Sequence, residues 1–117
     1  FFLGMKYPPA RKMIDSGLPV ALASDYNPGS SPSGNMKFIL SLATIIMKLT
    51  PEEAVNAATL NSAYAMGISD SHGSIGTGKR ANVLITKEIS SLWYLPYAYT
   101  SNLIDSVILG GKVVSRG

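Results

Sequence analysis

The 117-residue sequence predicts an α/β fold in which a part with both strands and helices is followed by a small β part. Three observations support this prediction. The continuous apolar run at residues 18–24 is typical of a parallel strand that is buried on both faces. The stretches 35–49 and 51–66 carry apolar residues at helical spacing. Two β-rich runs meet at Gly110-Gly111, which predicts a hairpin near the end of the chain.

Composition and charge exclude several classes of protein. With 46% hydrophobic residues the chain is globular rather than disordered, and its length suits one modest domain. The net charge of +3 is scattered, so we expect no nucleic-acid partner. The absence of cysteine excludes disulfides and thiolate metal sites and fits a reducing compartment. Polar residues interrupt the longest apolar segment, 36–49, so we expect no membrane span.

The first part of the chain is predicted to form a strand, a helix and a second strand, which together make a βαβ unit. Residues 1–3 look like the tail of a strand, and a chain that opens inside such an element is expected to be a fragment of a longer protein. Residues 9–16 should form the helix, with Pro9 in its first turn and Gly17 as its C-cap. The strand at 18–24 follows.

Two longer helices come next. The helix at 35–49 is apolar on most sides, so we expect it to be buried. The second helix begins with Thr50 as N-cap, Pro51 at the first position and Glu53 completing a capping box. It should run to Met66 and stop at the glycine that follows.

The later part of the chain changes to β structure. A turn-rich segment at 73–79 leads into a strand at 81–86, and the hairpin pairs 103–109 with 112–115. We therefore divide the chain into residues 1–70 and residues 71–117.

Three polar features are best explained by structure rather than chemistry. Asn61 lies on a helix face of small residues and is expected to be buried and hydrogen-bonded to a neighbouring loop. His72, the only histidine, lies in a polar loop and is expected to be solvated rather than catalytic. Residues 73–79 match most of a P-loop, but Arg80 stands where Ser or Thr should bind magnesium, so a turn into a strand is preferred. The small residues beside Asn61 are Ala54, Ala57, Ala58 and Ala65.

Asp25 is the strongest candidate for chemistry. It directly follows the predicted strand, and active sites of α/β folds lie where parallel strands end. The loop after it offers amides, hydroxyls and a carboxamide ahead of a helix N-terminus, where an anion is favoured. A carboxylate beside such a loop indicates metal-assisted chemistry on a substrate that carries a carboxylate. The alternative is that Asp25 only caps the loop or the helix. The loop groups belong to Asn27, Gly29, Ser30, Ser31 and Ser33.

Several stretches resemble one known family. Residues 21–32, Ala-Leu-Ala-Ser-Asp-Tyr-Asn-Pro-Gly-Ser-Ser-Pro, resemble the last barrel strand and loop of the imidazolonepropionases, which belong to the amidohydrolase superfamily. Residues 49–54 and 58–67 resemble the helices that follow, and residues 73–85 resemble the return into the small β-sandwich domain. Asn82 stands where many relatives carry Asp. The Asp-Tyr-Asn-Pro-Gly-Ser stretch is specific to the imidazolonepropionases, whereas the other motifs occur throughout the superfamily.

The resemblance implies a fold and a metal. Residues 1–70 would be the C-terminal part of a metal-dependent amidohydrolase (β/α)8 barrel, and residues 71–117 would be strands of the small β-sandwich domain. Asp25 would ligate a zinc or iron ion and handle protons for the metal-bound water. The other ligands, histidines on earlier strands, would lie in a missing N-terminal part, so the chain alone should be inactive.

The resemblance also implies an activity. The full-length enzyme would hydrolyse the ring amide of 4-imidazolone-5-propanoate to N-formimino-L-glutamate in histidine degradation. Asn27, Gly29 and Ser30 would hold this small-molecule substrate. A cytoplasmic homo-oligomer, a dimer, is implied as well. Two alternatives stay open: another hydrolase or deaminase of the superfamily, or a non-catalytic α/β binding module.

Overall fold

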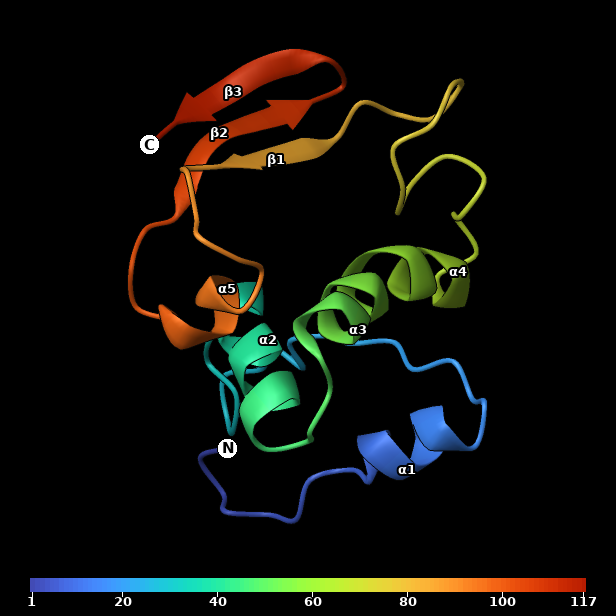
Figure 1. Ribbon diagram of the computed structural model, residues 1–117, viewed down its shortest axis with the longest axis vertical. Helices are drawn as coiled ribbons and strands as arrows, with labels where there is room; N and C mark the ends of the chain where they lie inside the picture. Colours follow the sequence, from blue (N-terminus) through green and yellow to red (C-terminus); the bar gives the residue numbers. More distant parts are fainter.

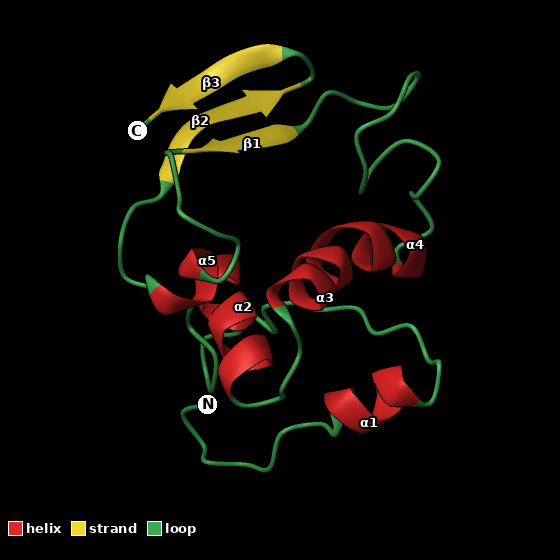
Figure 2. Cartoon of the chain, viewed as in Figure 1, coloured by secondary structure: helices red, strands yellow, loops and turns green.

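The computed structural model describes residues 1–117, apart from the side chain of Arg116. Helices and sheet lie in separate parts of the molecule, with the sheet at the top of the view and the helices below it (Figure 1, Figure 2). The helices are α1 (Ala10–Asp15), α2 (Met36–Ile45), α3 (Pro51–Asn56), the π-helical turn η1 (Ala57–Asn61), α4 (Ser62–Ala65) and α5 (Tyr94–Tyr97). The strands are β1 (Val83–Thr86), β2 (Ile104–Leu109) and β3 (Lys112–Arg116).

Helix α1 confirms the short helix predicted at 9–16, and Gly17 follows it with a positive φ of 79°. Helix α2 confirms the next prediction but ends at Ile45 rather than at residue 49. Its N-cap is Asn35, whose Oδ1 accepts hydrogen bonds from two backbone N–H groups of the first turn. The expected burial on most sides is wrong at the C-terminal end, where Ile45 is 53% exposed.

The second long helix is confirmed as the continuous run of α3, η1 and α4. Its capping box is formed, because Thr50 Oγ1 accepts from the N–H of Glu53 and the Glu53 carboxylate accepts from the N–H of Thr50. Gly67 ends the helix with a φ of 71°. The predicted alanine face is buried at its start, where Ala54 is 1% exposed, but Ala65 near the other end is exposed.

The β part is an antiparallel sheet in the order β1-β2-β3. Strand β1 confirms the strand predicted at 81–86, and β2 with β3 confirms the hairpin. Gly110 and Gly111 have positive φ values of 56° and 81°, which a two-residue type I′ turn requires. This turn is favoured because its twist matches that of the paired strands.

Two predicted strands are not formed in the described chain. Residues 1–3 make an exposed turn. The segment 18–24 has no strand partner, and the N–H of Leu22 donates instead to the carbonyl of Ala57 at 3.1 Å. Only one of its faces is buried, through Val20 and Leu22, each 9% exposed. Burial on both faces needs a neighbouring strand and a second layer, which the described residues do not supply, so the predicted βαβ unit is wrong for this structure.

The hydrophobic core lies among the helices. Several of its members are alanines, which allow the elements to approach closely. Helix α5, which the sequence did not predict, joins this layer because Ser41 Oγ on α2 donates to the carbonyl of Pro96 at 2.8 Å. None of the helices in the described part of the chain has the length and hydropathy of a membrane span. The buried core residues are Ala10, Val20, Leu22, Ala43, Leu49, Ala54 and Ala57.

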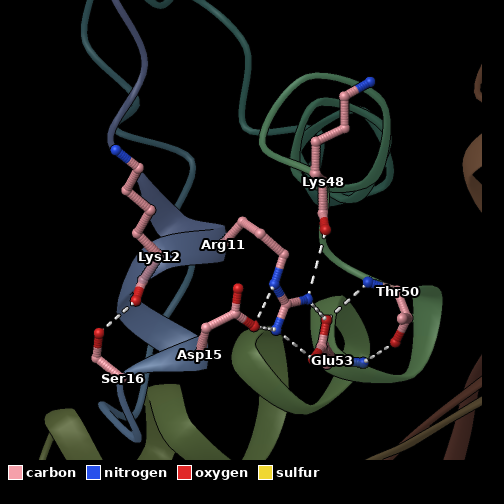
Figure 3. A network of polar contacts seen from close by, with 7 residues as sticks. All are labelled: Arg11, Lys12, Asp15, Ser16, Lys48, Thr50 and Glu53. Carbon is pink, nitrogen blue, oxygen red and sulfur yellow. Dashed lines mark hydrogen bonds and ion pairs between the residues drawn. The ribbon is translucent and has the colours of Figure 1, made fainter.

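An ion-pair network fastens α1 to α3 (Figure 3). Arg11 makes a bidentate contact with Glu53, with Nη1 to Oε2 at 2.6 Å and Nη2 to Oε1 at 3.0 Å. It also pairs with Asp15 within α1 at 2.7 Å. The Arg11 guanidinium, helped by the N–H of Thr50, lowers the pKa of the Glu53 carboxyl below its ordinary value of 4.5. One carboxylate thus caps α3 and holds α1.

Acid is expected to remove this stabilisation in a defined pH window. Because the pKa of Glu53 is lower in the folded than in the unfolded chain, its contribution is present above pH 4.5 and is lost as the pH falls below that value through the folded pKa. Thermal unfolding midpoints between about pH 7 and about pH 3 test this. The Glu53→Gln variant should lack this part of the acid-induced loss, and Glu52→Gln, at the exposed neighbour, should retain it. Identical pH profiles in all three proteins would contradict the prediction.

Gly73 is an interior glycine at which a side chain would not fit. It has a φ of +88°, and an added Cβ would lie 2.6 Å from Ala63 Cβ and 2.9 Å from the carbonyl oxygen of Thr59. Gly73→Ala should lower the free energy of unfolding by roughly 2–5 kcal/mol, from left-handed strain plus overpacking. Gly78 has a similar φ of +84° with no atom within 4 Å, so Gly78→Ala should cost only the strain, about 1–2 kcal/mol. Urea unfolding measures both, and equal losses would refute the steric argument.

Candidate functional site

Asp25 opens the loop that the sequence singled out, and its backbone conformation is unusual. Its φ is +51°, a left-handed conformation that aspartate and asparagine tolerate better than most other residues. The side chain is exposed, and the ion pairs of the described chain do not include it. The carboxylate is therefore open to a ligand that comes from outside the chain.

Asn27 organises the loop from within. Its Oδ1 accepts hydrogen bonds from the N–H of Gly29 at 3.1 Å, the N–H of Ser30 at 2.8 Å and the Ser30 hydroxyl at 3.2 Å. Its Nδ2 donates to the carbonyl of Asp25 at 2.9 Å. The backbone of Asn27 also pairs with Ser31 in an antiparallel bridge. The loop is thus a closed turn whose shape depends on one carboxamide.

The backbone N–H groups that were predicted to bind an anion are hydrogen-bonded to side chains of the chain itself. The N–H groups of Gly29 and Ser30 are bonded to Asn27. Two N–H groups at the start of α2 are bonded to Asn35. The Ser31 hydroxyl donates to the carbonyl of residue 24 at 3.1 Å. The site is therefore a carboxylate beside a prearranged turn, rather than an open ring of N–H groups.

The segment that leads into Asp25 is bonded to the helix behind it. Asn61 Nδ2 donates to the carbonyl of Val20 at 2.8 Å, which confirms the expected hydrogen bond of Asn61 to a neighbouring loop. Ser62 Oγ lies 2.8 Å from the carbonyl of Leu22, a contact that the sequence did not predict. A serine within a helix usually bonds to its own helix, so its identity gives no signal of a partner elsewhere.

The other polar candidates have partners of their own. His72 is half-buried rather than fully solvated, and its Nδ1 lies 2.8 Å from Ser71 Oγ. Lys79, in the glycine-rich turn, donates to the carbonyl of Ser69 at 2.6 Å and to Ser74 Oγ at 2.8 Å. These contacts close the turn ahead of β1, as expected for residues 73–79 if they form a turn into a strand rather than a P-loop.

A large hollow lies between the helices and the sheet, but it is not the candidate site. Its volume of 1310 Å³ exceeds the range of about 300–1,000 Å³ that is usual for ligand pockets. Its lining includes Met66, His72 and Leu84 but neither Asp25 nor the turn at 26–31. The hollow is therefore distinct from the site at Asp25, and His72 borders the hollow.

The described residues do not complete a metal centre. They contain no group of three or more His, Cys, Asp or Glu side chains that could hold an ion. A catalytic zinc normally has three protein ligands. The Asp25 carboxylate is a hard oxygen donor without an internal partner, so it fits a metal only as one member of a larger ligand set.

The chain belongs to the Amidohydrolase family, whose sequence model matches residues 3–114. Solved structures confirm the corresponding fold. An adenosine deaminase from Xanthomonas campestris with bound zinc has a TM-score of 0.81 and 25% identity, covering 95% of this chain and 29% of that chain. The guanine deaminase of E. coli has a TM-score of 0.78 and 21% identity, covering 99% and 32%.

Imidazolonepropionases are much more similar in sequence. Those of Flavobacterium johnsoniae and Christiangramia forsetii are 60% and 61% identical to this chain over 114 and 113 residues. Each alignment covers 97% of this chain, so the resemblance seen in separate motifs extends along almost all of it. The chain spans 28% of the length of these curated relatives.

Proposed function

We propose that this chain is the part of an imidazolonepropionase that supplies Asp25 and the turn at 26–31 to the active site. The reaction would be hydrolysis of the ring amide of 4-imidazolone-5-propanoate to N-formimino-L-glutamate. The observation that carries this proposal is the 60% identity to the Flavobacterium johnsoniae enzyme, compared with 25% to the adenosine deaminase. That difference favours a cyclic amide over a nucleoside as the substrate.

In this proposal Asp25 is one ligand of a zinc or iron ion, and the other ligands come from residues outside this chain. When bound, the metal lowers the pKa of water and polarises the amide carbonyl. The exposed carboxylate of Asp25 supports the assignment, because it is free of the ion pairs of the described chain. One of its oxygens can hold the proton that the attacking water loses.

Asn27, Gly29 and Ser30 would form the turn that faces the substrate. Asn27 would act chiefly as the scaffold of this turn, since three hydrogen bonds converge on its Oδ1. A turn that is ordered before binding loses little conformational entropy when the substrate arrives. Its internal hydrogen bonds therefore favour a binding role for the loop.

The proposal also covers the domain division, the cellular compartment and the oligomeric state. The division into residues 1–70 and 71–117 is supported by the separation of helices and sheet, although α5 returns to the helical layer (Figure 2). The resemblance to the imidazolonepropionases further supports a cytoplasmic enzyme that assembles as a homodimer.

A chimaera tests the proposed function. This chain would replace the matching segment of the Flavobacterium johnsoniae imidazolonepropionase, with the unmodified enzyme as positive control. We expect the chimaera to hydrolyse 4-imidazolone-5-propanoate. The chain alone, supplied with zinc or iron, should show no turnover above the metal-only background, because a lone carboxylate does not hold a catalytic zinc. A folded, zinc-loaded chimaera without activity would contradict the proposal, and so would turnover by the chain alone.

A further inference from the structure

We infer that Asn61 and Ser62 are positioning residues, which fix the backbone carrying Asp25 through hydrogen bonds to the carbonyls of Val20 and Leu22. The inference rests on the proposed function, because it takes Asp25 to be a residue whose exact place matters. Both side chains contact carbonyl groups of the segment that leads into the loop. They would therefore act on Asp25 indirectly, without contacting the substrate.

The contacts repeat along one edge of that segment. Asn61 Nδ2 donates to the Val20 carbonyl at 2.8 Å, and Ser62 Oγ lies 2.8 Å from the Leu22 carbonyl. The N–H of Leu22 donates in turn to the carbonyl of Ala57 at 3.1 Å. Alternate residues of an extended chain present their hydrogen-bonding groups on the same side. The helix thus holds the segment by both side-chain and backbone groups, in the manner of a neighbouring strand.

The same edge continues into the loop. Ser31 Oγ donates to the carbonyl of Ser24 at 3.1 Å, so three alternate carbonyls ahead of Asp25 each accept a side-chain donor. The intervening residues Ala21 and Ala23 make no backbone hydrogen bond within the described chain. The path of the backbone into Asp25 therefore depends on these donors.

The hydroxyl of Ser62 has one hydrogen and two carbonyls within reach, those of Leu22 at 2.8 Å and Ala57 at 2.7 Å. The carbonyl of Ala57 already accepts the N–H of Leu22. No other group of the described chain donates to the carbonyl of Leu22, a residue that is 9% exposed. Donation to Leu22 leaves all of these groups paired, so it is the favoured arrangement.

The π-helical turn η1 places these groups together. The N–H of Ser62 donates to the carbonyl of Thr59, three residues earlier, so the regular helical ladder is interrupted at this point. Ala57, Asn61 and Ser62 are then presented to the same segment. π-turns within helices occur often at functional sites. Here the interruption serves a segment that ends at the proposed metal ligand.

Variants of the chimaera test the inference. Ser62→Ala and Asn61→Ala remove the two donors, and Ser62→Thr keeps the hydroxyl. Thr59→Ala is the matched control, because it removes a hydroxyl that bonds only to the Val55 carbonyl of its own helix, at 2.7 Å. The readouts are kcat, KM for 4-imidazolone-5-propanoate, and zinc retained after dialysis. We expect the two donor deletions to lower kcat or zinc affinity about 10–100-fold with little change in KM, and Ser62→Thr and Thr59→Ala to retain both.

Two results would overturn the inference. In the first, Ser62→Ala and Asn61→Ala lower the thermal midpoint, but their kcat and zinc content in the folded enzyme equal those of Thr59→Ala. That result would show a merely structural role. Equal losses in Ser62→Ala and Ser62→Thr would show that the hydroxyl is not the cause. Failure of the proposed function looks different, because the unsubstituted chimaera would then be inactive. In that case the zinc content of the same variants decides the inference.

Discussion

Replacing Asp25 by asparagine in the chimaera is expected to lower kcat by on the order of 10³-fold or more. Metal-ion stabilisation of a transition state amounts to several kcal/mol, and about 1.36 kcal/mol corresponds to a factor of ten in rate. Asparagine tolerates the φ of +51° as well as aspartate does, so the loop keeps its backbone and only the charge is lost. Asp25→Ala should also abolish hydrolysis, but alanine is strained in this conformation and so mixes two effects.

The measurement pairs steady-state turnover with metal analysis of the same samples. Asp70→Asn is the control, since Asp70 is also an exposed loop aspartate outside the proposed site. We expect Asp70→Asn to match the unsubstituted chimaera, and Asp25→Asn to lose zinc together with activity. Near-normal kcat and full zinc content in Asp25→Asn would remove Asp25 from the ligand set.

The elements that the sequence predicted well depend on neighbours in the chain. The capping box of Thr50 and Glu53 spans three residues, and the hairpin turn needs only Gly110 and Gly111. Both are formed in the structure as expected. Their signals are local, so they do not depend on what the rest of the molecule supplies.

The structural features that the sequence did not predict correctly depend on contacts between residues far apart in the chain. The apolar run at 18–24 predicted a strand, but a strand also needs a neighbouring strand as partner. In the structure the N–H of Leu22 donates instead to the carbonyl of Ala57 in a helix. The bidentate pair of Arg11 and Glu53 joins residues 42 apart, and neither residue type names its partner in advance. The π-turn likewise lies where the helix bonds to Val20 and Leu22, a contact that composition does not reveal.

The candidate site was predicted in position but not in its internal bonding. The sequence placed Asp25 at the start of a polar loop, and the structure shows an exposed carboxylate there. The sequence also offered the N–H groups of Gly29 and Ser30 as anion donors, whereas the structure turns both onto Asn27. A pattern of polar residues shows which donors and acceptors exist, but it does not show which of them bond to one another.

This bonding changes what a substitution of Asn27 should do. The resemblance implies that Asn27 holds the substrate, and a residue with that role alone would, on replacement by alanine, chiefly raise KM. In the structure the carboxamide accepts from the N–H groups of Gly29 and Ser30 and donates to the carbonyl of Asp25. Its loss should release the turn and the backbone of the proposed metal ligand together. We therefore expect a fall in kcat as well as a rise in KM, with kcat/KM lower by about 10–100-fold.

Asn27→Asp separates the two halves of the carboxamide. It keeps an oxygen for the donors of Gly29 and Ser30, but it replaces the Nδ2 donor, 2.9 Å from the Asp25 carbonyl, by a charged oxygen that cannot donate. The turn should therefore persist, with KM close to that of the unsubstituted chimaera and the remaining loss in kcat. Steady-state kinetics of both variants in the chimaera measure this. If Asn27→Ala raised KM at unchanged kcat, the carboxamide would bind ground and transition states equally, and its role would be substrate contact rather than support of Asp25.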